Sequence, residues 1–168
     1  MAVPAGYLKD SGEVFAVQGN GFSYGWGCDF TAGPRNRYNQ GTRESSLVIP
    51  NREMTNCANN KWEIELPNGA YEVVVGYSDL QYPCHTSGCS LQGQSASVGT
   101  LPAGHSKTKT MDVVVDDGKL ALAGSYANQC TSFSFIHITT RGHEGHLGGI
   151  CYPGSYHIHC PGVGLMRA

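Results

Sequence analysis

Hydrophobic and polar residues alternate along several short stretches of this sequence. In the stretch KWEIEL, Trp62, Ile64 and Leu66 fall on one side of an extended chain, and Glu63 and Glu65 fall on the other. This period of two residues predicts a β-strand with one buried face and one face in solvent. The two glutamates are therefore expected to be solvated strand residues rather than the carboxylate pair of a glycosidase.

Turn sequences join neighbouring strand-like stretches and predict two hairpins. Residues 61–66 and 70–77 are separated by Pro-Asn-Gly, which favours a tight turn. Residues 108–115 and 119–124 are separated by Asp-Asp-Gly and predict a second hairpin. Residues 132–138 also alternate, and they add one more strand.

The remaining pattern indicates an all-β domain. Shorter strand candidates lie at 12–17 and 46–50, and no window has the period of an amphipathic helix. Strands at short spacing with glycine-rich turns predict an antiparallel β-sandwich. Residues 18–45 and 78–106 are long and irregular, and loops of that length are usually functional or held by disulfides.

The end of the chain differs from the rest. Residues 1–138 are expected to form the sandwich, whereas residues 139–168 show no strand pattern and contain four of the seven histidines. We expect this irregular tail to be either an appendage attached to the domain or a segment that pairs with another molecule.

The composition is that of a single domain with few charges. The chain has 168 residues, enough for a hydrophobic core, and only 14% of them are charged. A net charge of −2 argues against nucleic acid as the partner. Membrane insertion is not expected either, since no apolar stretch approaches the length of a membrane span.

Seven cysteines point to an oxidising compartment, and therefore to a secreted or cell-surface protein. None forms a CxxC pair, and we expect three disulfides with one cysteine free or paired to another chain. The short loops favour Cys84–Cys89 and Cys151–Cys160 as two of the pairs. The third pair is left among Cys28, Cys57 and Cys130.

Two segments carry a resemblance to a known family. They are G-x-S-Y-G-W within residues 21–30, and W-E-I-x-L-P-N-G-x-Y-x-V-x-V-G-x-x-D from residue 62. The order of features over roughly residues 4–138 resembles the malectin-like, galactose-binding-like β-sandwich modules. The resemblance implies an antiparallel jelly roll whose loops at one end present aromatic and polar groups to a sugar. The residues that match those loops are Tyr24, Trp26, Tyr77, Asp79, Tyr82, Tyr126 and Asn128.

These residue types suit a sugar, although packing is an alternative for each of them. A sugar ring offers an apolar C–H face, which stacks on Tyr or Trp, and hydroxyls, which bond to Asp or Asn. The same aromatic side chains could instead close the open end of the sandwich. Within residues 21–30 we expect Trp26 to point inward and Tyr24 outward, because Gly25 between them permits a bend.

Metal ions are a further alternative. Sandwich modules often hold a structural calcium ion, for which the candidate ligands are Asp10, Glu13, Asp29 and Asp112. No loop brings these carboxylates together in the sequence. Zinc candidates in the tail are His143, His146, His157 and His159. The spacing is not that of an HExxH motif, and we favour a solvent-exposed, disulfide-closed tail with incidental histidines over a zinc site.

The favoured hypothesis is a non-catalytic, lectin-like extracellular domain whose partner is a glycan and which needs no cofactor, a structural calcium apart. The alternative is a self-assembling structural protein of a fibre, sheath or array, which would form homo-oligomers through the tail or the odd cysteine. A metal-dependent enzyme centred on the tail histidines is the third hypothesis. No nucleophile elbow or phosphate-binding loop is present in the sequence.

Overall fold

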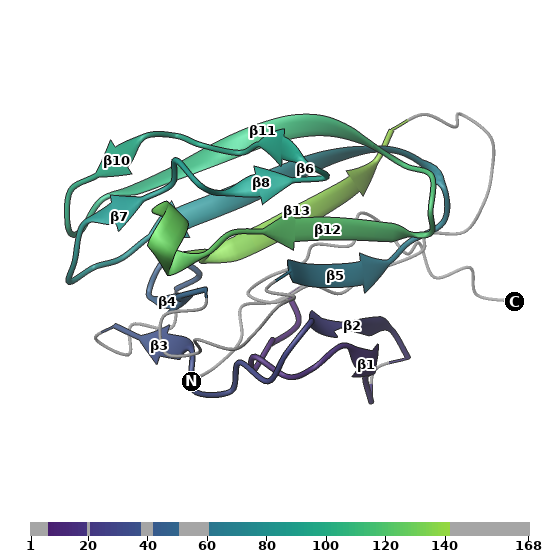
Figure 1. Cartoon of the computed structure of the whole chain (residues 1–168), viewed down its shortest axis with the longest axis horizontal. Helices are drawn as coiled ribbons and strands as arrows, with labels where there is room; N and C mark the ends of the chain where they lie inside the picture. Colours follow the sequence, from purple (N-terminus) through teal and green to yellow (C-terminus); the bar gives the residue numbers. More distant parts are fainter. Residues whose placement is uncertain (1–6, 20, 38–41, 51–60, 142–168) are drawn as a thin grey trace, which may run out of the picture.

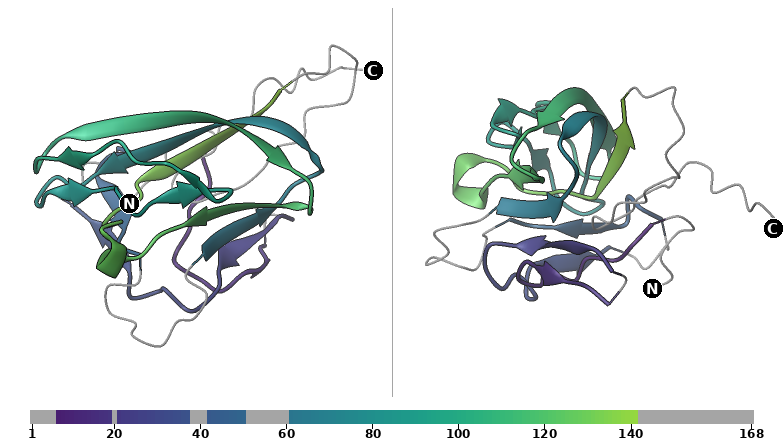
Figure 2. Two further views of the ribbon diagram at one scale, coloured as in Figure 1. Left: turned by 45° about the horizontal axis from the view of Figure 1, so that its top comes forward. Right: turned by 90° about the vertical axis from the view of Figure 1, so that its right-hand side faces the viewer.

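The chain folds as an all-β, antiparallel sandwich. The computed structural model describes residues 7–19, 21–37, 42–50 and 61–141. Two sheets pack face to face, and Figures 1 and 2 show the purple strands β1 and β2 on the opposite side of the molecule from the green β11. In the described part of the chain no helix is long and apolar enough to span a membrane.

The first sheet has six strands in the order β1-β2-β5-β12-β8-β9. In that order the strands are Ala16–Val17, Ser23–Trp26, Lys61–Glu65, Lys119–Ala123, Ser90–Leu91 and Gln94–Ser95. Every neighbouring pair of strands is antiparallel.

The second sheet is built on the two longest strands, and its order is β11-β6-β13. These strands are Ser106–Val115, Gly69–Ser78 and Phe135–Thr140. Strand β4, which pairs with β3, continues this layer through a bridge between Val48 and Phe133. The remaining elements are β3 (Pro34–Asn36), β4 (Ser46–Val48), β7 (Cys84–His85), β10 (Thr100–Leu101) and the 3-10 turn η1 (Tyr126–Asn128).

The strands form where side chains alternate between core and solvent. In β6, Tyr71, Val73, Val75 and Tyr77 are buried, while Glu72 between them is half-buried. The alternation predicted for residues 61–66 is confirmed in β5. The largest fully buried side chains, which define the core, are Trp26, Trp62, Tyr77, Phe30, Phe133, Leu47, Ile64, Leu91, Leu120, Ile136 and Val48.

Both predicted hairpins are wrong. Strand β5 pairs with β2 and β12, whereas β6 pairs with β11 and β13. The Pro-Asn-Gly and Asp-Asp-Gly turns therefore each carry the chain from one sheet to the other. We call these connections, residues 66–68 and 116–118, the two arches. Alternation shows which face of a strand is buried, but it does not show which strand lies beside it.

The expected disulfide between Cys84 and Cys89 is also wrong. Cys89 is bonded to Cys130, and Cys84 is a buried free thiol. Cys84 lies in β7 with its Sγ 2.7 Å from the Ser132 Oγ. Because this thiol is inside the domain, it is not placed to bond a second chain. Cys28 is disulfide-bonded as well, and Cys57, Cys151 and Cys160 lie outside the described residues.

The sandwich extends beyond the expected boundary at residue 138. Strand β13 continues to Thr140, whose pairing partner in β6 is Tyr71. Arg141 then forms ion pairs with Glu72 and Asp112, which lie on β6 and β11. Residues 142–168, which include all four zinc candidates, lie outside the described residues.

Candidate functional site

Tyr24 and Trp26 are both core residues. Their exposed fractions are 5% and 1%, and in β5 their pairing partners are Ile64 and Trp62. The expectation that Tyr24 points outward is wrong, because residues two apart in a strand lie on the same face. The Tyr24 hydroxyl donates to the Lys9 carbonyl oxygen at 3.3 Å. Neither ring presents a face to a ligand.

Tyr77 is also taken up by the interior. Its hydroxyl donates to the Ala96 carbonyl oxygen at 2.8 Å, and its ring packs against Phe133 with the centroids 5.9 Å apart. Burial raises the pKa of Tyr77 above its ordinary value. The side chain therefore holds the 96–98 region against β6 and does not reach the surface.

Asp79 follows the last residue of β6 and organises the loop after it. Its Oδ1 accepts hydrogen bonds from the backbone N–H groups of Gln81 and Tyr82, at 2.9 and 3.2 Å. The Arg37 guanidinium donates to both carboxylate oxygens, from Nε at 3.0 Å and from Nη2 at 2.9 Å. Such a two-point contact fixes the orientation of both side chains. Asp79 is buried, and it positions its neighbours instead of facing solvent.

Tyr82 is the aromatic residue that this loop exposes. The exposed fraction of Tyr82 is 57%, and the Arg37 Cζ lies 5.0 Å from the centre of its ring. Arg37 Nη1 also donates to Gln81 Oε1 at 3.2 Å, so the guanidinium is bound on two sides. We call Arg37, Asp79, Gln81 and Tyr82 the Tyr82 platform. In this platform the Arg37 guanidinium lies against the Tyr82 ring, and more than half of the Tyr82 surface remains exposed to solvent.

A second exposed aromatic residue lies on η1. The exposed fraction of Tyr126 is 46%, and Asn128 is exposed as well. Ser125 caps this turn, its Oγ accepting from the Asn128 N–H at 3.2 Å, and the disulfide at Cys130 follows two residues later. Strands β3 and β7 flank the platform in sequence. They lie at the same end of the sandwich as η1 (Figure 1).

Two members of the platform, Arg37 and Gln81, were not identified from the sequence. Arg37 lies 42 residues before Asp79, and no motif or spacing connects them. The contact exists because the chain after β3 passes the end of β6. A basic residue in an irregular loop carries no signal of its own, so tertiary structure was needed to find it.

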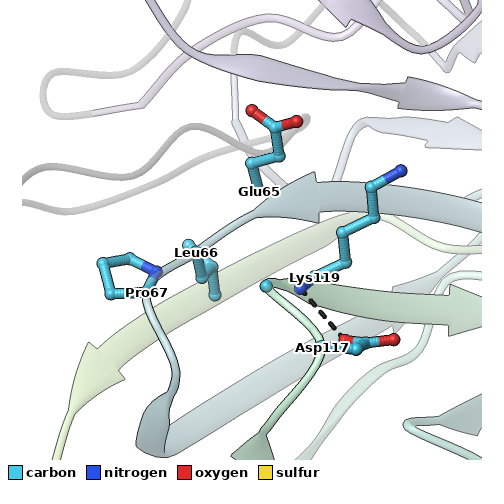
Figure 3. Close-up of a pocket in the computed structure, with 6 residues that line it drawn as sticks. Glu65, Leu66, Pro67, Asp117 and Lys119 are labelled. Atoms are coloured by element: carbon cyan, nitrogen blue, oxygen red, sulfur yellow. Dashed lines mark hydrogen bonds between the residues drawn. The ribbon is translucent and has the colours of Figure 1, made fainter.

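The two arches lie at the end of the sandwich opposite β3 and β7 (Figure 1). An open pocket of about 430 Å³ lies between them. Its lining residues are Glu65, Leu66, Pro67, Asp117, Gly118 and Lys119. Figure 3 shows the Glu65 and Lys119 side chains extending to the same side, with the Lys119 backbone N–H donating to Asp117 Oδ1 at 3.1 Å. The lining contains no aromatic ring on which a sugar could stack.

The four calcium candidates do not form one group, although Glu13 lies near enough to Asp10 to repel its charge. Asp29 accepts from the Thr31 side chain, and Asp112 pairs with Arg141 on the outer strands. Both carboxylate oxygens of Asp10 accept N–H donors inside the core, an arrangement that does not suit a cation. Within the described ranges no three His, Cys, Asp or Glu side chains come together as a metal site. Calcium binding stays an untested expectation.

No protein-family model matches this sequence, and no curated protein matches it. Among solved structures, protein YXIM of Bacillus subtilis matches with a TM-score of 0.55 and 19% identity, over 83% of this chain and 37% of that chain. A calcium-binding mutant of Bacteroides uniformis beta-glucuronidase 2 matches with a TM-score of 0.50 and 13% identity, over 76% of this chain and 15% of that chain.

A third match is Xyl-CBM35 in complex with a glucuronic acid-containing disaccharide, with a TM-score of 0.33 and 16% identity, over 85% of this chain and 90% of that chain. The chain spans well under two thirds of the two better-scoring proteins. At such low identities those two likenesses concern the fold alone, and they agree with a β-sandwich.

Proposed function

We propose that this chain is a non-catalytic, lectin-like carbohydrate-binding domain that binds a glycan at the Tyr82 platform and works outside the cell or at its surface. The observation that carries the proposal is the exposed ring of Tyr82, held in place by Arg37 and Asp79. Of the seven residues expected to bind sugar, four are buried, and Tyr82, Tyr126 and Asn128 stay accessible.

The platform has the properties that sugar stacking needs. A pyranose loses little entropy on binding if the ring beneath it is already fixed, because no side chain must be ordered at that moment. Here the backbone N–H of Tyr82 bonds to Asp79, and Arg37 lies against the ring. The Gln81 amide and the Tyr82 hydroxyl supply donors and acceptors beside the stacking surface.

A non-catalytic role agrees with the placement of the strand carboxylates. Glu63 bonds to Lys61 at 2.8 Å and lies 3.7 Å from Lys119, on the outer face of the first sheet. It is therefore part of a surface charge network instead of facing a second carboxylate across a cleft. The Cys89–Cys130 disulfide supports the extracellular part of the proposal.

The test is a glycan array probed with the oxidised protein displayed on a multivalent carrier, because single sites of this kind bind weakly. We expect a confined set of glycans to bind. The variant Tyr82→Ala should lower binding to them by at least about tenfold, through loss of the stacking surface. Tyr82→Phe should retain most of the binding, since it keeps the ring and loses only the hydroxyl.

The matched control is Val114→Ala, which truncates an exposed side chain on β11. It should bind like the wild type. Glycan binding that survives Tyr82→Ala unchanged would place the sugar elsewhere and overturn the proposed site. A blank array from protein that is folded and oxidised would argue against carbohydrate binding altogether.

A further inference from the structure

A carboxyl group lies inside the sandwich core, away from the Tyr82 platform. Asp10 is fully buried, and the backbone N–H of Gly12 donates to its Oδ1 at 2.6 Å. The Trp26 indole Nε1 donates to its Oδ2 at 2.9 Å. Asp10 thereby attaches the first described segment of the chain to strand β2.

The indole of Trp62 lies next to the same carboxyl group. Trp62 pairs with Trp26 across β5 and β2, and its Nε1 is buried without a hydrogen-bond partner among the described residues. A cavity of about 10 Å³ lies beside these groups, and its lining residues are Asp10, Trp26, Trp62, Leu122, Phe133, Phe135 and Ile136. Asp10 is the one ionisable residue in that lining.

Other charges are turned away from this carboxyl. On β5, Lys61, Glu63 and Glu65 alternate with Trp62 and so lie on the outer face. By the same alternation Lys119 on β12 lies on the face opposite Leu122, and the His137 ring on β13 lies against Tyr7, with the ring centres 6.5 Å apart. Glu13, from the same segment as Asp10, is the charged group that acts on it, and this effect is repulsive.

We infer that Asp10, Trp26 and Trp62 form a pH-sensitive element of the core, in which loss of the Asp10 proton weakens the packing of the 7–15 segment on the first sheet. A buried carboxylate with no cation partner is costly, whereas a protonated carboxyl is not. Burial raises the pKa of Asp10 to about 7, and it outweighs the hydrogen bonds from Gly12 and Trp26, which favour the ionised form.

The direction of the pH effect follows from this balance. The carboxyl has its ordinary pKa of 3.8 in the unfolded chain and a pKa of about 7 in the folded one. Between these two values the folded state binds more protons than the unfolded state, so stability falls as the pH rises. The loss begins near pH 4 and is complete above about pH 7.

The experiment follows the two indole N–H resonances of the full-length protein by ¹H–¹⁵N NMR between pH 4.5 and 8.5. Because the chain has two tryptophans, two signals are expected, and both should shift with one midpoint near pH 7. The titration should vanish in Asp10→Asn. In Glu13→Gln the midpoint should fall, since a repulsive charge has been removed.

A second measurement covers the case in which Asp10→Asn does not fold. The thermal unfolding midpoint of the wild type should be higher at pH 5 than at pH 8, and Glu13→Gln should narrow the difference. Indole signals that stay still across this range, or that titrate below pH 5, would overturn the inference. So would a midpoint near 7 that persists unchanged in Asp10→Asn.

Discussion

At the scale of single residues, Gly25 decides how residues 21–30 fold. Its φ is +144°, and the backbone of residues 13–15, which pairs with Trp26, lies directly against it. The Trp26 N–H donates to the Glu13 carbonyl oxygen, and the Phe15 N–H donates to the Trp26 carbonyl oxygen, each at 2.8 Å. Gly25 thus makes room for the backbone of residues 13–15 beside β2, and Tyr24 and Trp26 remain on one face.

A side chain at position 25 should be strongly destabilising. A Cβ there would lie 2.8 Å from the Glu13 carbonyl oxygen and from the Phe15 backbone nitrogen. We expect Gly25→Ala to lower the free energy of unfolding by roughly 3 kcal/mol, from strain and overpacking together. Denaturant titration measures this change.

Gly99→Ala is the control for the Gly25 substitution. Gly99 also has a positive φ, +85°, but its added Cβ would meet no atom within 4 Å. It should cost only about 1 kcal/mol, the backbone strain alone. Equal effects of the two substitutions would show that the contact between residues 13–15 and Gly25 is not tight.

At the scale of the elements, the two arches hold each other in place. The Leu66 N–H donates to the Gly118 carbonyl oxygen at 2.9 Å. The Asn68 side chain donates to the Asp116 carbonyl oxygen at 2.7 Å and accepts from the Gly118 N–H at 2.8 Å. The Asn68 amide therefore links the two arches, each of which carries the chain from one sheet to the other.

Removal of the Asn68 amide should loosen this end of the sandwich. Because both hydrogen bonds are near the surface, water can replace them in part, and Asn68→Ala should cost about 1 kcal/mol in free energy of unfolding. Asn68→Asp should not recover it, since a carboxylate cannot donate to the Asp116 carbonyl oxygen. Thermal or chemical unfolding of the variants provides the measurement.

Gln94→Ala, on the exposed edge strand β9, is the matched control for Asn68. It should change stability by less than about 0.5 kcal/mol. If Asn68→Ala is no more harmful than this control, the two arches are held by the strands that flank them and not by the amide.

At the scale of the whole molecule, packing decides which cysteines meet. The Cys89–Cys130 bond joins the loop after β7 to the chain after η1, across 41 residues. A bond that closes a loop of this length stabilises the fold by roughly 4 kcal/mol in the chain-entropy account. Cys84, only five residues from Cys89, remains a buried thiol.

The Cys84 thiol should resist alkylation in the native, oxidised protein. It is fully buried, and burial raises its pKa, so little reactive thiolate forms. Peptide mapping after iodoacetamide treatment should find Cys84 unmodified before unfolding and modified after it. Replacement of both Cys89 and Cys130 by Ala should speed the labelling, because the fold opens more often. A Cys84–Cys89 peptide in the map would contradict the pairing described here.

The longer strands could be predicted from the sequence, but the residues of the candidate site could be predicted only in part. Strands β5 and β13 could be located from the alternation of polar and hydrophobic residues, β6 from its β-branched and aromatic residues, and β11 and β12 from the turn residues between them. Tyr82 could be named as a candidate, but not separated from Tyr77, which has the same residue type and a neighbouring position. Burial distinguishes the two, and burial depends on the segments that pack over each ring.

The fold class and the positions of the five longest strands could be predicted from the sequence, because alternation, residue type and turn residues act locally along the chain, whereas the short strands within residues 18–45 and 78–106 were missed. Tertiary structure decided which strands pair, which cysteines bond and which aromatic rings remain exposed. Each of these outcomes joins residues that are distant in sequence, such as Arg37 with Asp79, or Asp10 with Trp26. Such contacts form only when two sheets close over one core, and no local pattern encodes them.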